Sequence, residues 1–254
     1  MPLPQTPTFR LDSRLALVPG AGQGIGFACA CALAEAGATV TLCARSEGAL
    51  GTAVEAITPA GHHAEAAVLD VCDIAAVRRF LSSRPSFDIL VNNAGGNRPK
   101  PFTQVEEADY AAVLNLNLKA AFFVAQGVAA GMVSAGRTGS IINMSSQMGH
   151  IGGQNRSLYC ASKWGLEGLS KAIALDLAPY RIRVNTLCPT FIETPLTKPF
   201  FEDEAFLASV LSKIKLGRLG QVTDLMGAIV FLASDASALM TGSAVVIDGG
   251  WTAD

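Results

Sequence analysis

The stretch 18–30, VPGAGQGIGFACA, places glycines at alternate positions between a short apolar run and an alanine-rich segment. The fingerprint G-x-G-x-x-G does not fit here, because isoleucine or phenylalanine stands where its last glycine belongs. The pattern that fits is G-x-x-x-G-x-G, on Gly20, Gly24 and Gly26. A turn without Cβ atoms lets backbone N–H groups approach a pyrophosphate at the N-terminus of the following helix. The stretch therefore predicts a dinucleotide-binding turn, with a glycine-rich turn that holds no ligand as the alternative.

Apolar runs of strand length alternate with alanine- and leucine-rich stretches of helical length along the whole chain. The expected strands are 15–18, 39–43, 64–69, 87–91, 139–144, 183–187 and 244–247. The main expected helices are 24–36, 106–135, 157–178 and 221–233. This alternation favours an α/β fold, a single doubly wound parallel sheet of about seven strands flanked by helices, Rossmann-like. No linker or repeat divides the chain, so we expect one domain, 1–254.

Composition excludes several classes of function. Half of the 254 residues are hydrophobic and 16% are charged, which suits a sheet covered on both faces. A net charge of −2 without Lys/Arg runs predicts no nucleic-acid partner. No apolar run reaches 18 residues and no signal peptide is found, so we expect no membrane contact. Six cysteines without a C-x-x-C pair predict a reduced, cytoplasmic protein, and three scattered histidines predict no metal site.

Further short motifs follow the glycine turn in order. They are Asp70-Val71, Asn92-Asn93-Ala94-Gly95, Asn117, Ser146, Tyr159-x-x-x-Lys163 and Pro189-Thr-Phe-Ile-Glu-Thr194. The ordered set resembles the short-chain dehydrogenase/reductase family, including its 3-oxoacyl reductase and sugar or polyol dehydrogenase members. The resemblance runs from about residue 10 to the closing Asp248-Gly249-Gly250. It implies an oxidoreductase that interconverts a secondary alcohol and a ketone by hydride transfer with a nicotinamide cofactor.

Two residues depart from the family pattern. Pro19 stands where the family has threonine, and Thr190 replaces the usual glycine after Pro189. Proline has neither a hydroxyl nor an N–H, so whatever hydrogen bond the threonine makes is absent. We therefore expect some loss of local order at Pro19 without loss of the binding site.

Tyr159 and Lys163 are four residues apart in a helical pattern, so they share one helix face, about 6 Å apart along the axis. A tyrosine near its free pKa of about 10 is a poor base at neutral pH. An adjacent ammonium and the oxidised nicotinamide favour the phenolate, which makes Tyr159 the expected acid/base. Ser146 can donate to the substrate oxygen. The resemblance gives Asn117 the task of holding a water that links Lys163 to solvent.

The type of nicotinamide cofactor depends on the end of the second expected strand. No carboxylate lies between Glu35 and Glu47; Ala44 occupies the expected acidic position and Arg45 follows it. An arginine can pair with a 2′-phosphate, which favours NADP(H), whereas an Arg45 that only stacks on adenine or is solvated would leave NAD(H). The full set of expected cofactor contacts is Gly20, Gln23, Gly24, Ile25, Gly26, Arg45, Asp70, Val71, Asn92, Ala94, Gly95, Tyr159, Lys163, Pro189, Ile192 and Thr194.

Polar residues near the catalytic motifs are candidates for contact with a small-molecule substrate. The substrate candidates are Asn97, Gln147, His150, Gln154 and Phe200. The amides would suit a hydroxyl-rich substrate and favour a sugar or polyol dehydrogenase. The alternatives are a 3-oxoacyl-thioester reductase and, from another class, a non-catalytic dinucleotide-sensing protein.

The segment 195–216 is expected to cover the substrate. Pro195 and Pro199 interrupt regular structure at its start. The pattern of 202–215 then predicts an amphipathic helix with Phe206, Val210 and Ile214 on one face. It is either a mobile lid or a fixed surface helix. The family resemblance also implies a homotetramer that pairs the helices 106–135 and 157–178.

Overall fold

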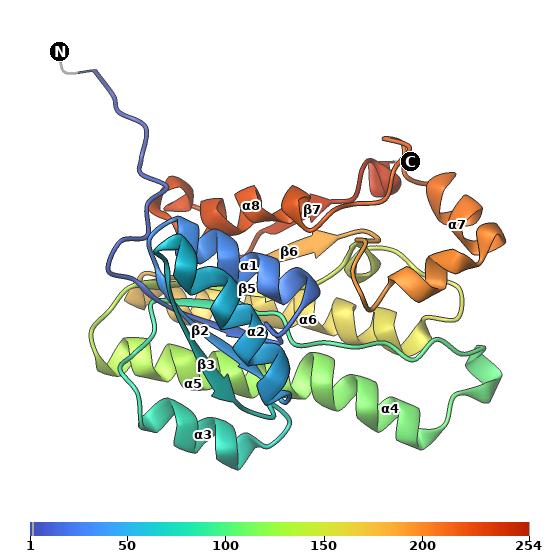
Figure 1. Ribbon diagram of the computed structural model, residues 1–254, viewed down its shortest axis with the longest axis horizontal. Helices are drawn as coiled ribbons and strands as arrows, with labels where there is room; N and C mark the ends of the chain where they lie inside the picture. Colours follow the sequence, from blue (N-terminus) through green and yellow to red (C-terminus); the bar gives the residue numbers. More distant parts are fainter. Residues whose placement is uncertain (2, 254) are drawn as a thin grey trace.

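The computed structural model describes residues 1 and 3–253 and contains one parallel seven-stranded sheet (Figure 1). The strand order is β3-β2-β1-β4-β5-β6-β7. The strands are β1 (Leu15–Pro19), β2 (Thr39–Ala44), β3 (His63–Val68), β4 (Ile89–Asn92), β5 (Gly139–Met144), β6 (Ile182–Pro189) and β7 (Ala244–Ile247). The predicted fold class is confirmed. Each expected strand is present, with its ends displaced by no more than two residues.

Helices cover both faces of the sheet (Figure 1). They are α1 (Gly24–Glu35), α2 (Glu47–Ile57), α3 (Ile74–Ser82), α4 (Glu107–Leu114), α5 (Ala121–Ser134), α6 (Ser157–Leu177), α7 (Glu204–Leu211) and α8 (Thr223–Ala233). One core cluster joins α1, α2 and α8 to the sheet, and a second joins α3, α5 and α6 to its other face. The inner strands are therefore buried between two apolar layers, as their continuous apolar runs require, whereas the edge strands β3 and β7 are partly exposed.

Pro19 ends β1 without disturbing the sheet. The β1–β4 pairing involves Ala16 and Leu17 and stops before Pro19, so the missing N–H falls beyond it. The turn that follows is held from both sides. Asn93 donates its amide to the carbonyl oxygens of Pro19 (3.3 Å) and Gly20 (3.1 Å), and the Gly20 N–H donates to the carbonyl of a β2 residue at 2.7 Å. The loss of local order expected at Pro19 stays a prediction.

The expected helix 106–135 is interrupted. Its first part, α4, and its last part, α5, flank a π-helical turn at Asn115–Ala120. By length and composition alone, Glu107–Ser134 could cross a membrane, and 44% of its most apolar window is buried inside the protein. Val124, Val128 and Met132 of this stretch pack in the core cluster that also holds residues of α3 and α6.

Candidate active site

The four expected catalytic residues come from three parts of the fold that meet beside the end of β5. Ser146 follows β5, Tyr159 and Lys163 lie in α6, and Asn117 lies in the π-helical turn. The Lys163 ammonium donates to the carbonyl oxygen of Met144, the last residue of β5, at 2.8 Å. The same nitrogen lies 5.5 Å from the centre of the Tyr159 ring. The predicted helix face is therefore present, and it is joined to the strand end that bears Ser146.

Lys163 is buried, with 4% of its surface exposed. The pKa of its ammonium is lowered to about 8, because the effect of burial outweighs the raising effects of the nearby Cys188 and Glu167. The carbonyl of Met144 accepts one of the three ammonium hydrogens. A lysine in this state carries a positive charge that water screens weakly, so its field acts strongly on groups at the same site.

In the absence of a cofactor, burial has the largest effect on the pKa of Tyr159. Burial raises the pKa of its phenol, and this outweighs the lowering by a hydrogen bond with Ser146 and by the charge of Arg156. Before a cofactor binds, the phenol is therefore protonated at neutral pH. A neutral phenol beside Ser146 is set up to give a proton to an oxygen, which is what reduction of a ketone requires.

Asn117 ties two parts of the site together. Its side-chain oxygen accepts from the Gly96 N–H at 2.8 Å, and its amide donates to the Gly96 carbonyl at 2.9 Å and to the Ser162 hydroxyl at 3.0 Å. The loop after β4 is thereby fixed to α6, directly beside Lys163. The water-holding role expected for Asn117 stays a prediction.

The glycine turn has the form that a pyrophosphate requires. Gly20 is left-handed at φ +75°, and a Cβ there would lie 2.9 Å from the Ala94 Cα. Helix α1 begins at Gly24, and its N-cap residue Gln23 makes no side-chain capping hydrogen bond. The first N–H groups of α1 are thus left for another acceptor, and the helix dipole favours an anion there. The residues present fit a nicotinamide dinucleotide, whose pyrophosphate would lie against this turn.

Arg45 and Asp70 follow the carboxyl ends of the parallel strands β2 and β3, so both lie at the same end of the sheet. Arg45 is exposed and forms no ion pair within the part of the chain that the structure describes. The next residue, Ser46, caps α2 by accepting from the Ala49 N–H at 3.3 Å. Asp70 is exposed and turns its carboxylate onto the Cys72 N–H at 2.9 Å, whereas the adjoining Val71 is buried. An exposed guanidinium without a partner is available to a phosphate.

The residues of Asn92–Gly95 have different structural roles. The Asn92 side chain is buried and donates to the Ala121 carbonyl (2.8 Å) and to the Asn143 side chain (3.1 Å), so it holds β4 to its neighbours. Its side chain therefore faces the core, and the expected cofactor contact of Asn92 stays a prediction. Asn93, which was not among the expected site residues, holds the glycine turn instead. A Cβ on Gly95 would lie 3.8 Å from the Lys163 nitrogen, which places this loop beside the catalytic lysine.

The residues after β6 return to the glycine turn. A Cβ on Gly24 would lie 3.4 Å from the Thr194 Cβ, so Thr194 stands over the start of α1. Its N–H donates to the Thr197 hydroxyl at 2.9 Å, which fixes the local turn. Ile192 is buried and bridges to Gly220, and Pro189 is the last residue of β6.

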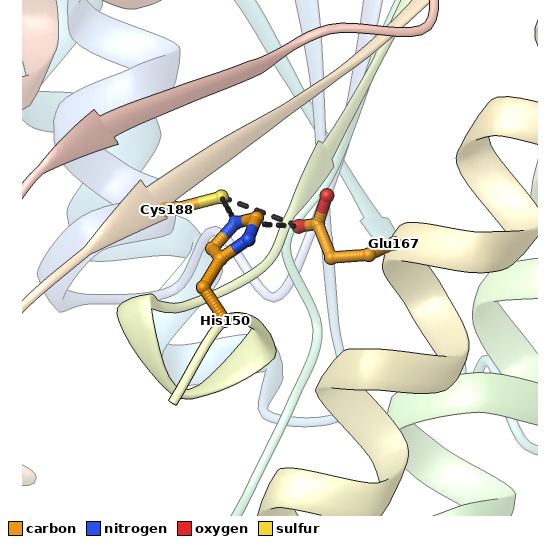
Figure 2. A group of neighbouring side chains, drawn as sticks. All are labelled: His150, Glu167 and Cys188. Atoms are coloured by element: carbon orange, nitrogen blue, oxygen red, sulfur yellow. Dashed lines mark hydrogen bonds and ion pairs between the residues drawn. The ribbon is translucent and has the colours of Figure 1, made fainter. Parts of the chain in front are cut away.

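The substrate candidates fall into two groups. Asn97, Gln154 and Phe200 are exposed, and their substrate role stays a prediction. Gln147 is 1% exposed, and neither atom of its amide has a hydrogen-bond partner among the described residues. A buried unpaired amide is costly, so a bound hydroxyl or a water would stabilise it. His150 instead turns its ring toward Cys188 and Glu167 (Figure 2).

The helix within the segment 195–216 is shorter than expected. Helix α7 spans Glu204–Leu211, rather than 202–215, because the Asp203 carboxylate caps it by accepting from the N–H groups of Ala205 (3.0 Å) and Phe206 (3.1 Å). Val210 and Ile214 are buried on the expected face.

An aromatic cluster joins this segment to the loop after β6. Phe201 and Phe206 stack on each other, both meet the Phe191 ring edge to face, and Phe191 stacks on Trp251 with ring centres 5.6 Å apart. Of the neighbouring residues Phe200 and Phe201, it is Phe201 that joins this cluster.

Comparison with known proteins agrees with this geometry. Residues 20–252 match the family model described as enoyl-(acyl carrier protein) reductase. L-xylulose reductase from Bos taurus is 38% identical over 245 residues, which cover 96% of this chain and 99% of the relative. The chain belongs to the short-chain dehydrogenase/reductase family. It is an NAD(P)-dependent oxidoreductase that interconverts a secondary alcohol and a ketone, so the resemblance read from the sequence is confirmed.

Two further relatives of this short-chain dehydrogenase/reductase carry different substrate names. A (3R)-3-hydroxyacyl-CoA dehydrogenase from Canis lupus familiaris is 39% identical over 256 residues, covering 95% of this chain and 97% of the relative. A crystal structure of a gluconate 5-dehydrogenase from Burkholderia cenocepacia, in complex with NADP and tartrate, superposes with a TM-score of 0.93. It is 38% identical and the match covers 97% of this chain and 98% of that one.

Proposed function

We propose that this enzyme reduces the ketone of a small, hydroxyl-rich substrate with NADPH, and catalyses the reverse oxidation of the corresponding alcohol. The observation that carries the proposal is the Gln147 amide, which is buried beside Ser146 and has no hydrogen-bond partner among the residues that the structure describes. A site built to hydrogen-bond a substrate hydroxyl leaves such a group unpaired until the substrate arrives. The names of the xylulose and gluconate relatives support the same substrate class.

Each catalytic side chain has one task in this proposal. The bound cofactor supplies the hydride that reaches the carbonyl carbon. The Ser146 hydroxyl donates to the carbonyl oxygen and holds it against the Tyr159 phenol. Tyr159 gives its proton to that oxygen as negative charge develops there, and the Lys163 ammonium stabilises the phenolate that remains. A water held at Asn117 then returns a proton by way of Lys163.

A substrate panel tests the proposal against its alternatives. Ketoses, polyols and sugar acids would be compared with a 3-oxoacyl thioester while nicotinamide absorbance is recorded with both NADPH and NADH. We expect the highest kcat/KM for a hydroxylated ketone. A preference for the thioester would favour the second candidate, which the (3R)-3-hydroxyacyl-CoA dehydrogenase relative supports. Cofactor binding without turnover of any compound would support a dinucleotide sensor.

Arg45 provides the basis for a preference for NADP(H) over NAD(H). We expect the double change Ala44→Asp with Arg45→Ala to shift the preference toward NAD(H) by about 1–3 kcal/mol, because one charge-assisted contact is lost and a repelling carboxylate is gained. The measurement is kcat/KM for each cofactor in the parent and the variant. A parent enzyme that already prefers NADH would show that Arg45 does not bind the 2′-phosphate.

A homotetramer is the proposed assembly, built from α4, α5 and α6. These helices expose large apolar side chains, including Tyr110, Phe122, Trp164 and Leu175, the last with 77% of its surface accessible. We expect light scattering to give a tetramer at micromolar concentration and a smaller species for Trp164→Glu. Val68→Glu, at an exposed position on the edge strand β3, is the matched control and should stay tetrameric. A monomeric parent would refute the assembly.

The proposed lid is the first part of the segment 195–216. Residues 195–202 are largely exposed and hold only a short 3₁₀ turn, whereas α7 is anchored through Val210 and Ile214. We expect amides 196–202 to exchange fast in the free enzyme and to gain protection with cofactor and alcohol bound, because closure excludes water. Amides of α7 should be protected throughout. Hydrogen exchange measured by mass spectrometry distinguishes a mobile lid from a fixed loop. Equal protection of 196–202 with and without ligands would show that the loop is fixed.

A cytoplasmic location is proposed with this function. All six cysteines are free in the structure, as expected where thiols are kept reduced. The net charge of −2 supports a small dissolved substrate rather than nucleic acid or an anionic membrane surface.

A further inference from the structure

Three side chains from separate elements meet near the end of β6 (Figure 2). His150 follows the short turn after β5, Glu167 lies in α6, and Cys188 lies in β6. The imidazole Nε2 is 3.4 Å from the Cys188 Sγ and 3.8 Å from the Glu167 Oε1, and the Sγ is 3.2 Å from the same oxygen. The three atoms form a small triangle in which nitrogen, sulfur and oxygen face one another.

The triangle has the dimensions of one face of a tetrahedral metal site. Zinc binds histidine nitrogen and carboxylate oxygen at about 2.0–2.2 Å and cysteine sulfur at about 2.3 Å. With tetrahedral angles, those bond lengths place the ligand atoms about 3.3–3.6 Å apart. The observed edges of 3.2–3.8 Å span this range, so shifts of a few tenths of an ångström would admit the ion.

The surroundings support a ligand role for each group. The Thr186 hydroxyl donates to the other carboxylate oxygen of Glu167, Oε2, at 2.9 Å and turns Oε1 toward the triangle. Glu167 is 6% exposed and, among the described residues, has no lysine or arginine ion pair. A buried carboxylate is ordinarily paired or bound to a metal. The His150 side chain is 32% exposed, which leaves an approach from solvent.

We propose that His150, Glu167 and Cys188 form a binding site for one zinc ion, with water as the fourth ligand. Binding replaces the thiol proton of Cys188, which leaves to solvent, by a sulfur–zinc bond, and no electron is transferred. Three protein ligands with one open position are typical of accessible zinc sites, whereas buried structural sites use four. Thiolate and imidazole ligands favour zinc over magnesium or calcium.

The position of the site predicts its effect on the enzyme. Glu167 lies one helical turn after Lys163, and its negative charge favours the ammonium form of Lys163. A divalent cation bound to Glu167 removes that support. Turnover therefore falls when zinc binds, an expectation that rests on the proposed role of Lys163.

Calorimetry with ZnCl₂ and absorption spectroscopy with CoCl₂, on the cofactor-free enzyme, test the site without reference to activity. We expect one ion per chain and a thiolate-to-cobalt charge-transfer band. Cys188→Ser should abolish the band and weaken zinc by more than roughly 100-fold, and His150→Gln by at least roughly tenfold. Cys72→Ser is the matched control, because Cys72 is an exposed cysteine beside Asp70 and would hold an adventitious ion.

The results separate the site from its effect. Absence of saturable binding, or binding that survives Cys188→Ser but not Cys72→Ser, overturns the zinc site. His150→Gln changes a partly exposed position, so it serves if the buried Cys188 variant fails to fold. Saturable zinc binding with unchanged turnover would confirm the site and overturn its effect on Lys163. If the enzyme proved inactive toward every substrate, calorimetry would still test whether zinc binds.

Discussion

Phenylalanine at position 159 lowers kcat by about 10²–10⁴-fold, the range that a positioned proton donor contributes. The substitution removes one oxygen and keeps the ring, so the packing of α6 is retained. The lost group is the phenol whose pKa is raised by burial and which hydrogen-bonds Ser146. NADPH affinity should change little, because the glycine turn and Arg45 are untouched. Steady-state rates give kcat, and fluorescence titration of NADPH gives the affinity.

Tyr180→Phe is the matched control for this prediction. Tyr180 is half exposed in the turn after α6, away from the residues placed at the site, and the same oxygen is removed there. Its kcat should equal that of the parent. A Tyr159→Phe enzyme that kept more than roughly a tenth of the parent kcat would show that another group transfers the proton.

A methyl group at Gly26 destroys cofactor binding. Gly26 lies in the first turn of α1, and its Cβ would overlap the Gly20 carbonyl oxygen and the Asn93 amide. Both belong to the hydrogen bond that closes the glycine turn, so the turn must open to admit the methyl. We expect Gly26→Ala to lower the free energy of unfolding by about 1–3 kcal/mol, as overpacking does, and to remove measurable NADPH binding. Urea unfolding and calorimetric titration measure the two quantities.

Gly48→Ala gives the contrast within the same chain. Gly48 lies in the first turn of α2, and a Cβ there meets nothing within 4 Å. This substitution should leave NADPH affinity unchanged and raise stability by up to about 1 kcal/mol, because alanine favours helix over glycine. If Gly26→Ala bound NADPH like the parent, the glycine turn would not be the pyrophosphate site.

The parts of the fold that follow from local pattern could be predicted from the sequence. The inner strands are buried on both faces and appear as continuous apolar runs. All seven strands were found, although their ends moved by a residue or two. Helices α2 and α3 were not among the main helices expected. Both are largely exposed, and Ala53 and Val77 are among their few buried residues, so their apolar periodicity is weak. The π-helical turn at Asn115–Ala120 leaves no trace in an apolar pattern that continues through it.

The site could be predicted only where its residues lie close in sequence. Tyr159 and Lys163 share a helix face by their spacing alone. The contact of Asn93 with Gly20, and that of His150 with Cys188, join residues far apart in the chain and depend on strand order. The upward pKa of Tyr159 depends on how deeply the phenol is buried, which spacing does not reveal. The phenolate expected with the oxidised nicotinamide bound stays a prediction.

The chain contains two tryptophans, and they occupy places where different events occur. Trp251 stacks on Phe191, whose ring meets Phe201 of the proposed lid edge to face, so its emission responds when residues 195–202 move. Trp164 is exposed on α6, and its emission shifts to shorter wavelength when a second subunit covers that helix. Trp164→Phe and Trp251→Phe each leave a single intrinsic fluorophore. Closure over the substrate and association of subunits thus become two separable optical signals from one unlabelled protein.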